Sequence, residues 1–387
     1  MITSAWLHTP DGHTRARGLG LEFEGEPGPH NAITDVPGVL VGTSTIIEGD
    51  GEHRYLEGPI RTGVTMILPR GREGVGVPCA AGLYSMNGNG EMTGSHWIKE
   101  SGSLSTPIGL TNTHAVGTVH RGIIDWIASN RPNVAAQWQL PVVAETWDGF
   151  LNDINGVHVK RYHVLEAIDH ANAGPCNEGS VGGGTGMNCY GFKGGNGTAS
   201  RKVRFGSATY TVGVHLQCNF GGRGELTIKG APVGRAVDAP CQIQSDEWFD
   251  ADRRVPPGAG SVIAIVATDA PLLPQQLEGL AKRVPLGLAR TGTTGSHFSG
   301  DIFLAFSTAN AGSLISEFPS AANPRSELDS LSFIPWGDID SFYTATVRCV
   351  EEAVLNALIA NDDMTGRNGH FSPALPHDQL RSILGLP

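Results

Sequence analysis

The chain alternates between segments patterned like strands and segments patterned like helices, which is typical of an α/β protein. Strands are predicted where β-branched residues cluster or where apolar residues alternate with small or polar ones, at residues 39–47, 64–68, 141–145, 204–217, 261–268 and 302–307. Helices are predicted where apolar residues recur three and four positions apart, at residues 118–129, 162–173, 271–284, 341–360 and 376–384.

Composition excludes several classes of protein. Of 387 residues, 40% are hydrophobic and only 17% are charged, so we expect a folded chain with a large buried core rather than a disordered one. The 53 Gly and 24 Pro follow no G-X-Y period, which excludes collagen and leaves a loop-rich compact enzyme.

The charge balance restricts the partners. Lys and Arg number 27 against 38 Asp and Glu, which gives a net charge of −11, and the basic residues form no dense run. Because nucleic-acid binding depends on Lys and Arg that neutralise phosphates, we expect no nucleic-acid partner. The sequence shows neither the pattern of a signal peptide nor a run of about 18 apolar residues. We therefore expect no membrane partner and a cytoplasmic protein, with the periplasm left open.

The familiar site motifs are missing from the sequence. The six cysteines are scattered, with no C-x-x-C pair and no zinc-type spacing, which predicts reduced, mostly buried thiols and no metal site. H-E-x-x-H, the P-loop, G-x-S-x-G and a dinucleotide-binding G-x-G-x-x-G are also missing. Glycine-rich runs at 182–186 and 194–197 can cradle an anion, but no Lys-Ser/Thr follows them, so we interpret them as tight turns. His114 fits a hydrogen-bonded core or turn residue as well as a catalytic one.

A polar segment ends abruptly at an apolar strand. Residues 229–260 are acidic in the middle and finish in Pro-Pro-Gly-Ala-Gly, which predicts a solvated loop open to cleavage. Ser261 is then expected to be the first strand residue. After a glycine that does not shield its carbonyl, this serine is positioned to attack its own peptide bond. Cleavage would expose an α-amine with a pKa of about 7.7 to 8, which can act as a base for the hydroxyl. The alternative is that Gly260 and Ser261 only join a loop to a strand.

Six stretches of the sequence carry a family resemblance. They resemble the DmpA-type family of L-aminopeptidase D-amidase/esterases and β-peptidyl aminopeptidases, peptidase family S58, over most of the chain. The stretches are NAITDVPGVLV at 31–41, PVVAETWDGFLNDING at 141–156, EGSVGGGTGMNCYGFK at 178–193, HLQCNFG at 215–221, GSVIAIVATDAPL at 260–272 and TGTTGSHFSGDIFLA at 291–305. The resemblance implies an α/β fold, a four-layer αββα sandwich that is similar to N-terminal-nucleophile hydrolases but differently connected. It also implies one domain, 1–387, that cleaves itself into 1–260 and 261–387, and it implies no metal or organic cofactor.

The resemblance also implies the catalytic residues. Ser261 corresponds to the nucleophile, with cleavage between Gly260 and Ser261. Ser299 and Asp301 match the S-G-[DE] motif, and Ser299 is expected to relay a hydrogen bond between the Ser261 amine and Asp301. Asn219 is expected to donate to the oxyanion.

Two further residues are expected to bind substrate. Glu145, together with Asp301, supplies negative charge for the ammonium group of the substrate. Trp147 stands where the amidase branch has tyrosine, so it is expected to line the pocket instead of supplying a phenolic hydroxyl.

These residues predict a self-processing serine aminopeptidase or amidase. Its substrates would be short peptides, amino-acid amides or esters, with the choice among β-, L-α- and D-residues left open. The large and small chains are expected to stay associated, in a homo-oligomer of four or more protomers. One alternative is acyl transfer to an amine, as in the ornithine acetyltransferases, which use a threonine nucleophile. Another is a binding scaffold that never matures.

Overall fold

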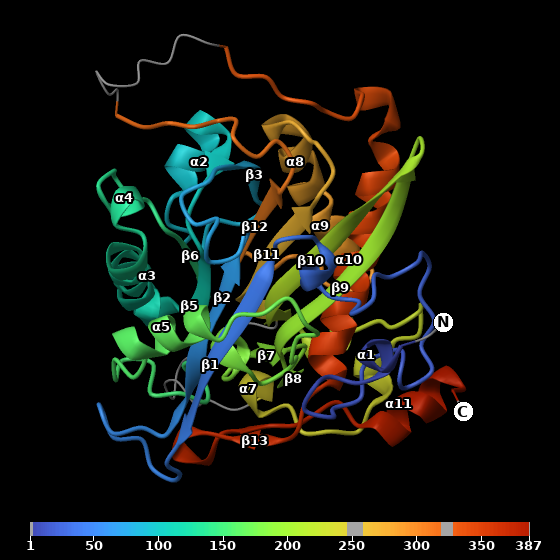
Figure 1. Ribbon diagram of the computed structural model, residues 1–387. Coiled ribbons are helices and arrows are strands. Elements are labelled where there is room, and N and C mark those ends of the chain that lie inside the picture. Colours follow the sequence, from blue (N-terminus) through green and yellow to red (C-terminus); the bar gives the residue numbers. More distant parts are fainter. Residues whose placement is uncertain (1–2, 246–257, 319–327, 387) are drawn as a thin grey trace.

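The computed structural model describes residues 3–245, 258–318 and 328–386. Two β-sheets lie face to face, and each carries helices on its outer side, so the layers run helix, sheet, sheet, helix (Figure 1). This arrangement confirms the predicted α/β class and the four-layer αββα sandwich.

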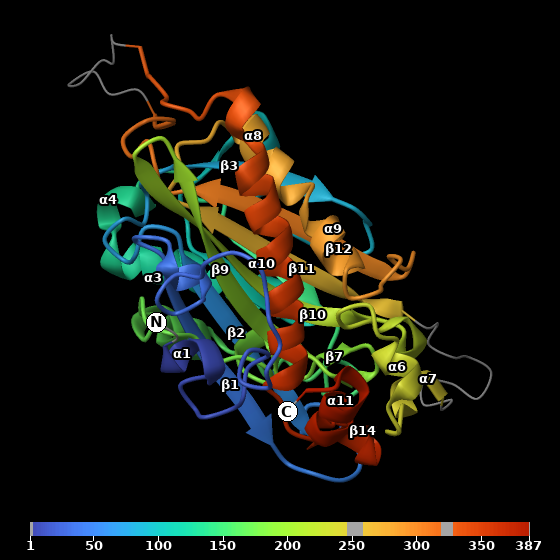
Figure 2. The ribbon, with the colours of Figure 1, turned by 90° about the vertical axis from the view of Figure 1, so that its right-hand side faces the viewer.

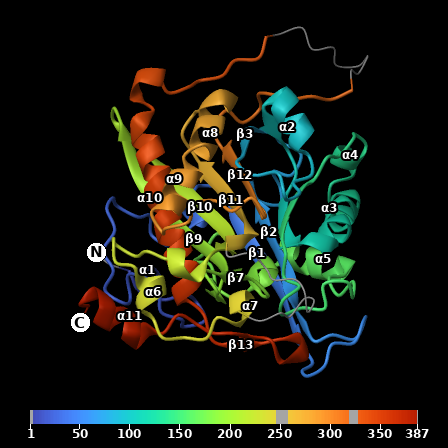
Figure 3. The same cartoon turned by 180° about the vertical axis from the view of Figure 1, so that it is seen from behind.

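The first sheet has four strands in the order β1-β2-β5-β6, of which only the β5–β6 pair is parallel. Helices α3 and α5 cover its outer face, on the side away from the second sheet (Figure 3). Their bounds are β1 Leu40–Glu48, β2 Ile60–Leu68, β5 Ile108–Asn112, β6 Val142–Thr146, α3 Val116–Asn130 and α5 Arg161–Asp169.

The second sheet has six strands in the order β4-β3-β12-β11-β10-β9, of which only the β11–β12 pair is parallel. Helices α8, α9 and the long α10 pack on its outer face (Figure 2). Their bounds are β3 Cys79–Ser85, β4 Ser103–Leu104, β9 Gly195–Phe205, β10 Ala208–Gly221, β11 Gly258–Thr268, β12 Ser299–Ser307, α8 Pro274–Ala281, α9 Val284–Ala289 and α10 Asp340–Ile359.

Short elements complete the described chain. They are α1 Ser4–Leu7, η1 Ile33–Asp35, α2 Ser95–Ser101, η2 Thr113–Ala115, α4 Pro132–Ala135, η3 Gly182–Gly184, β7 Asn188–Cys189, β8 Phe192–Lys193, η4 Arg223–Glu225, α6 Val233–Ala236, α7 Gln242–Ser245, η5 Trp336–Asp338, β13 Met364–Thr365, η6 Arg367–Gly369, β14 Phe371–Ser372 and α11 His377–Leu384. All six cysteines lie among the described residues and are free thiols, four of them buried, as predicted. Within the described ranges, no helix combines the length and apolarity needed to cross a bilayer.

Three apolar cores separate the four layers. On β11, Val262 and Val266 pack toward the helices, whereas Ile263 and Ile265 pack between the sheets. This alternation follows from the period of two along a strand. A third core lies between the first sheet and α3 and α5. The face on which a strand residue lies therefore decides whether it meets helices or the opposite sheet.

Some predicted boundaries were wrong. Residues 204–217 are not one strand: β9 ends at Phe205 and β10 begins at Ala208, so the run is a hairpin. Residues 194–197 are not a tight turn, because β9 already begins at Gly195, whereas 182–186 does contain the short 3-10 turn η3. A Cβ on Gly197 would lie 2.0 Å from a backbone oxygen of α10, so this strand needs glycine for close helix packing.

The region before Ser261 also differs from the prediction. Ser261 is not the first residue of its strand, since β11 begins at Gly258, and 229–260 includes the short helices α6 and α7. The predicted loop residues 246–257 lie outside the described part. The helix predicted at 271–284 is shorter, because α8 spans Pro274–Ala281 and a second helix, α9, starts at Val284.

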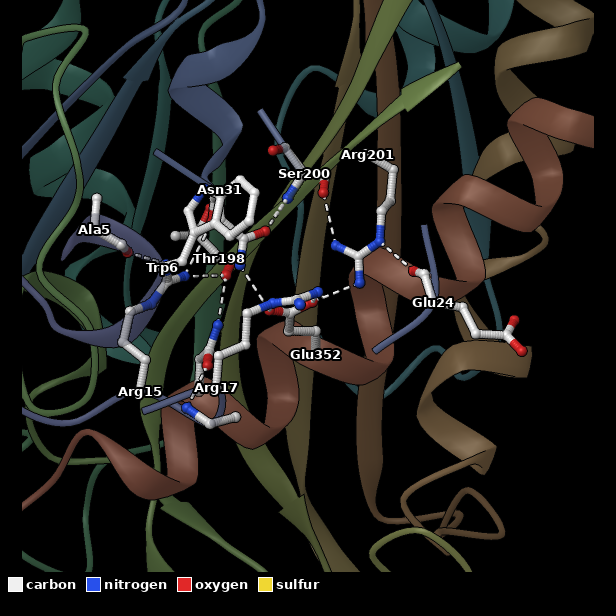
Figure 4. A network of polar contacts seen from close by, with 12 residues as sticks. Ala5, Trp6, Arg15, Arg17, Glu24, Asn31, Thr198, Ser200, Arg201 and Glu352 are labelled. Atoms are coloured by element: carbon white, nitrogen blue, oxygen red, sulfur yellow. Dashed lines mark hydrogen bonds and ion pairs between the residues drawn. The ribbon is translucent and has the colours of Figure 1, made fainter. Parts of the chain in front are cut away.

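A buried ionic network joins the N-terminal segment to α10 (Figure 4). The Glu352 carboxylate, fully buried on α10, pairs with Arg17 at 2.6 Å and with Arg201 at 2.5 Å. It also accepts a hydrogen bond from the Asn31 side chain at 2.6 Å. Burial opposes the charge of Glu352, but these cations outweigh burial and hold its pKa at about 2.

Candidate active site

Ser261 lies in the middle of the second sheet, with 4% of its surface exposed. On one side it is paired with Asn219 of β10, and on the other it lies beside Gly300 of β12. Because Ile263 and Ile265 of the same strand face the first sheet, Ser261 faces the first sheet as well. The register, rather than a flexible loop, thus places the predicted nucleophile.

The Ser261 hydroxyl lies against the peptide bond that it is predicted to attack. Its Oγ donates to the carbonyl oxygen of Gly260 at 2.7 Å and accepts from the backbone N–H of Gly300 at 3.2 Å. β11 extends across this junction, from Gly258 to Thr268. Two bonds fix the hydroxyl close to the Gly260 carbonyl before any reaction occurs.

Gly260 occupies a position that other residues would strain. Its φ is +151°, which side chains disfavour, and an added Cβ would lie 1.8 Å from the backbone oxygen of Asn219. The residue before Ser261 is thus restricted to glycine by the close approach of β10.

Asn219 lies across from Ser261, and its side chain is held at both ends. Its Oδ1 accepts from the backbone N–H of Asn188 at 2.8 Å, and its Nδ2 donates to the carbonyl of Trp147 at 2.9 Å. Directly paired antiparallel residues have Cβ atoms about 5 Å apart, so this amide lies beside the Ser261 hydroxyl. An amide has two N–H donors, and the second is available to an oxyanion.

Ser299 and Asp301 form a pair on β12, as their spacing predicts. The Ser299 hydroxyl donates to Asp301 Oδ1 at 2.5 Å, and Asn87 Nδ2 donates to Oδ2 at 3.1 Å. Burial raises the pKa of Asp301, while the donors Ser299 and Asn87 act against that rise. These hydrogen bonds therefore favour the charged form of the buried Asp301 carboxylate.

The Ser299–Asp301 pair lies on the opposite face of the sheet from the Ser261 hydroxyl. By register, Ser299 is the neighbour of Gly260 and Asp301 that of Val262. In the uncut chain the pair thus lies next to the backbone of the Gly260–Ser261 junction, where the α-amine would be released. The relay from that amine to Asp301 stays a prediction.

Glu145 is the penultimate residue of β6 in the first sheet and is 3% exposed. Its carboxylate accepts from the backbone N–H of Glu91 at 2.9 Å and from the Thr113 hydroxyl. Burial raises the pKa of Glu145, and these two hydrogen bonds act against that rise. A Cβ on Gly90 would lie 3.4 Å from Glu145 Oε1 and 3.1 Å from the Cα of Gly300. One glycine thus separates Glu145 from the strand beside Ser261.

Trp147 contributes through both its backbone and its ring. Its carbonyl orients Asn219, and its indole packs so closely on Gly149 that an added Cβ would lie 2.2 Å from the ring. The structure thus brings Trp147 to the same side of Ser261 as Asn219. Its predicted contact with substrate stays a prediction.

Sequence reasoning missed the residues that position the others. Asn87, Thr113 and Asn188 each bond a predicted site residue, but they lie in the loop after β3, in η2 and in the short strand β7. His114 lies in η2, where its backbone N–H donates to the Asn112 side chain and its ring bonds Asn155, which favours its structural interpretation. Pattern and spacing carry no signal for these partners, because only the fold brings them to the site.

Comparison with known proteins identifies the group to which the chain belongs. The family model described as peptidase family S58 matches residues 31–372, which include every site residue named above. The chain belongs to peptidase family S58.

Relatives within S58 agree over nearly the full length. The chain is 48% identical to the beta-peptidyl aminopeptidase BapA of Sphingosinicella microcystinivorans, covering 96% of this chain and 91% of the relative. It is 44% identical, at a TM-score of 0.85, to the L-aminopeptidase D-Ala-esterase/amidase from Ochrobactrum anthropi, over 96% and 98% of the two chains. A Burkholderia sp. beta-aminopeptidase is 42% identical at the same TM-score and coverage.

These similarities confirm the predicted family, fold class and type of enzyme. The Ochrobactrum structure is described as a prototype of the serine aminopeptidases with a new variant of the Ntn hydrolase fold, which agrees with the predicted N-terminal-nucleophile-like sandwich. This S58 chain is thus a serine aminopeptidase-type hydrolase.

Proposed function

We propose that the chain is a self-processing aminopeptidase in which Ser261 cuts the Gly260–Ser261 bond and then serves as the nucleophile for substrates. The observation that carries this proposal is the Ser261 hydroxyl, hydrogen-bonded at 2.7 Å to the carbonyl oxygen of the bond to be cut. The glycine-only backbone at residue 260 supports the same assignment.

Processing follows as an acyl shift from nitrogen to oxygen. The Ser261 Oγ forms a bond to the Gly260 carbonyl carbon, the C–N bond to Ser261 breaks, and the proton of the hydroxyl passes to the departing nitrogen. Water then hydrolyses the ester and releases the carboxylate of Gly260. The Asn219 amide is placed to donate to the oxygen that becomes negative.

Turnover uses the new N-terminus. The free α-amine, with a pKa of about 7.7 to 8, takes the proton of the hydroxyl as it attacks the first amide or ester of the substrate. The acyl group passes to Ser261 Oγ, and the leaving amine or alcohol takes up a proton. Water then frees the acyl group. Ser299 and Asp301, beside the junction, are placed to orient the amine.

The two chains are proposed to stay together after the cut. Residues 261–387 supply β12 and nearly all of β11, the two central strands, which are paired on either side with β3 and β10 of residues 1–260. Separation would therefore open the middle of the sheet. The Glu352 network adds ion pairs between the same two parts.

The substrates are proposed to be short peptides, amino-acid amides or esters with a free N-terminal amine. Two buried carboxylates lie near the junction, Glu145 on the first-sheet side of the Ser261 strand and Asp301 on its helix side, and their negative charge favours a cationic group at the site. The names of the relatives, beta-peptidyl aminopeptidase and L-aminopeptidase D-Ala-esterase/amidase, support both β- and α-amino-acid derivatives.

A homo-oligomer of four or more protomers is also proposed. An aromatic cluster on the surface supports it: the Trp138 ring lies 6.2 Å from that of Trp97 and 4.7 Å from that of Phe318, measured between centroids. Trp138 is 37% exposed and Phe318 is 62% exposed, and exposed apolar clusters mark interfaces. The number of protomers is measured from the sedimentation coefficient of the purified protein.

Substitution of the nucleophile tests the proposed function. Ser261→Ala removes the attacking oxygen, so the chain should stay uncut on a denaturing gel and hydrolyse no aminoacyl p-nitroanilide. Ser101→Ala, a distant hydroxyl on α2, is the matched control and should cut and turn over normally. N-terminal sequencing of the wild-type small chain should begin at Ser261. A different start, or normal processing of Ser261→Ala, would overturn the proposal.

A further inference from the structure

A cavity of about 180 Å³ lies on the outer side of the second sheet, at α10 and away from Ser261. Its lining is mainly charged and comes from five parts of the chain, namely Phe23, Glu24, Arg201, Lys229, Arg290, Arg348 and Glu351. A water occupies roughly 30 Å³ in the liquid, so the cavity has room for a small ion with several waters.

Positive charge exceeds negative charge in this lining. Four cationic side chains meet two carboxylates, and one of those, Glu351, is shared between Arg290 at 2.8 Å and Lys229 at 3.5 Å. The other, Glu24, pairs with Arg348 but has a side chain that is 75% exposed, so it neutralises Arg348 weakly. Glu352, outside the lining, balances Arg201. The other three cations of the cavity therefore have only Glu351 and the exposed Glu24 to balance them.

Two arginines of the lining carry N–H donors without acceptors. The Nε of Arg348 is buried and has no hydrogen-bond partner among the described residues. Arg201, almost fully buried, uses three of its five N–H donors, on the backbone oxygens of Glu24 and Ser200 and on Glu352 (Figure 4). Buried donors of a charged group are costly to leave unsatisfied. An oxyanion in the cavity would supply both the missing charge and the missing acceptors.

We propose that this cavity, termed the α10 cavity, binds a phosphate-sized oxyanion, either free phosphate or the phosphoryl group of a larger molecule. Arginine guanidinium groups match the geometry of phosphate oxygens, and Lys229 adds a point charge that is held 4.3 Å above the Phe23 ring. No residue of the α10 cavity belongs to the catalytic site.

Binding at the α10 cavity would connect the two chains of the processed protein. Phe23, Glu24, Arg201 and Lys229 precede residue 261, whereas Arg290, Arg348 and Glu351 follow it. An anion held by both sets stabilises their association, because it binds only the assembled form. This consequence, unlike the binding itself, rests on the proposed cleavage.

Binding is tested with inorganic phosphate and with glycerol phosphate, each against chloride at equal ionic strength. Both the processed protein and uncut Ser261→Ala should show a saturable rise in Tm with inorganic phosphate, and calorimetry should give a single site. Saturation by glycerol phosphate as well identifies a phosphoryl group as ligand, and saturation by inorganic phosphate alone identifies the free ion.

Variants connect the effect to the α10 cavity. Arg348→Gln should weaken phosphate binding about tenfold or more, since it removes a charge-assisted contact. Lys229→Gln, at a half-exposed position, provides the second variant if Arg348→Gln folds poorly. Arg121→Gln, the same change at an exposed site on α3, should leave binding unaltered. The proposal is overturned if the Tm rises equally with chloride, or if both cavity variants bind phosphate like wild type. Because uncut Ser261→Ala is also tested, phosphate binding can be judged even if the proposed processing does not occur.

Discussion

The Cα of Gly260 lies so close to the carbonyl oxygen of Asn219 that an added Cβ would sit 1.8 Å from it. Since both atoms belong to paired strands, neither can move without opening the β10–β11 ladder. Gly260→Ala should displace the scissile carbonyl from the Ser261 hydroxyl. This displacement and the disfavoured φ should both raise the activation barrier of processing. We expect the rate to fall by about tenfold or more, because each 1.4 kcal/mol added to the barrier costs a factor of ten. A time course of the two bands on a denaturing gel measures the rate.

Gly224→Ala is the control for this change, because an added Cβ there meets no atom within 4 Å. Its rate of processing should equal that of wild type. Processing of Gly260→Ala at the wild-type rate would show that the close approach of β10 does not position the bond.

Asn219 is predicted to stabilise the oxyanion through its Nδ2. Asn219→Ala removes the donor and should reduce kcat by roughly 100-fold to 1,000-fold. It also leaves the N–H of Asn188 without its acceptor. Asn219→Asp keeps an oxygen for that N–H but loses the donor, so it should be at least as slow as the alanine variant. Because Asn219 is also proposed to assist processing, steady-state rates are divided by the amount of small chain seen on a denaturing gel to give both kcat values.

Folding must be separated from catalysis in these variants. Circular dichroism should show that Asn219→Asp retains the wild-type fold, and Asn130→Ala, a change at the exposed end of α3, should retain full kcat. If folded Asn219→Asp keeps most of its kcat, the oxyanion role belongs to another donor.

Asn87 is predicted to position Asp301 and to keep it ionised. Burial raises the pKa of Asp301, and the Asn87 amide, which donates to Oδ2 at 3.1 Å, acts against that rise. Asn87→Ala should therefore raise this pKa further, so that the carboxylate protonates at higher pH as the solution is acidified. The acidic limb of the profile of kcat/KM against pH should move upward, which a purely structural role would not produce.

Asn89→Ala is the matched control, since Asn89 lies in the same loop but donates to the carbonyl of Phe298. Its pH profile should follow wild type. If the acidic limb of Asn87→Ala does not move, Asn87 does not influence the pKa of Asp301.

Local sequence predicts the elements better than their ends. The amphipathic helix α3 and the β-branched strand β1 are found within two residues of prediction, because one face of each is buried and the pattern records it. The strand β3, with sequence CAAGLYS, is buried over its first five residues, shows no alternation and was missed. Gly195 and Gly197 indicate a turn in isolation, yet they lie in β9 because α10 packs directly on that strand.

The site divides along similar lines. Ser261, Ser299 and Asp301 stand in short motifs, and the structure places all three at the junction of β11 and β12. Asn87 and Thr113 have no motif of their own, since their roles arise from contacts with carboxylates distant in the sequence. Motifs thus predict candidate catalytic groups, and tertiary packing decides which groups hold them.

Glu352 is predicted to contribute much of the stability that joins α10 to the large chain. Its buried carboxylate pairs with Arg17 and Arg201, so Glu352→Gln leaves one buried and one partly buried cation uncompensated. The free energy of unfolding should fall by about 3–5 kcal/mol at pH 7. Urea denaturation of the uncut Ser261→Ala chain measures this loss without dissociation of two chains. Glu278→Gln, which removes a surface pair with Lys282, should cost less than about 1 kcal/mol.

The stabilisation by Glu352 is also predicted to depend on pH. The pKa of Glu352 is lowered from 4.5 to about 2 in the folded protein, so the unfolded chain takes up a proton first as the pH falls. The stabilisation is complete above pH 4.5 and is lost progressively between pH 4.5 and 2. The difference in unfolding free energy between Ser261→Ala and its Glu352→Gln derivative should be constant from pH 8 to 5 and shrink below that. A difference that stays constant down to pH 3 would show that the network does not lower this pKa.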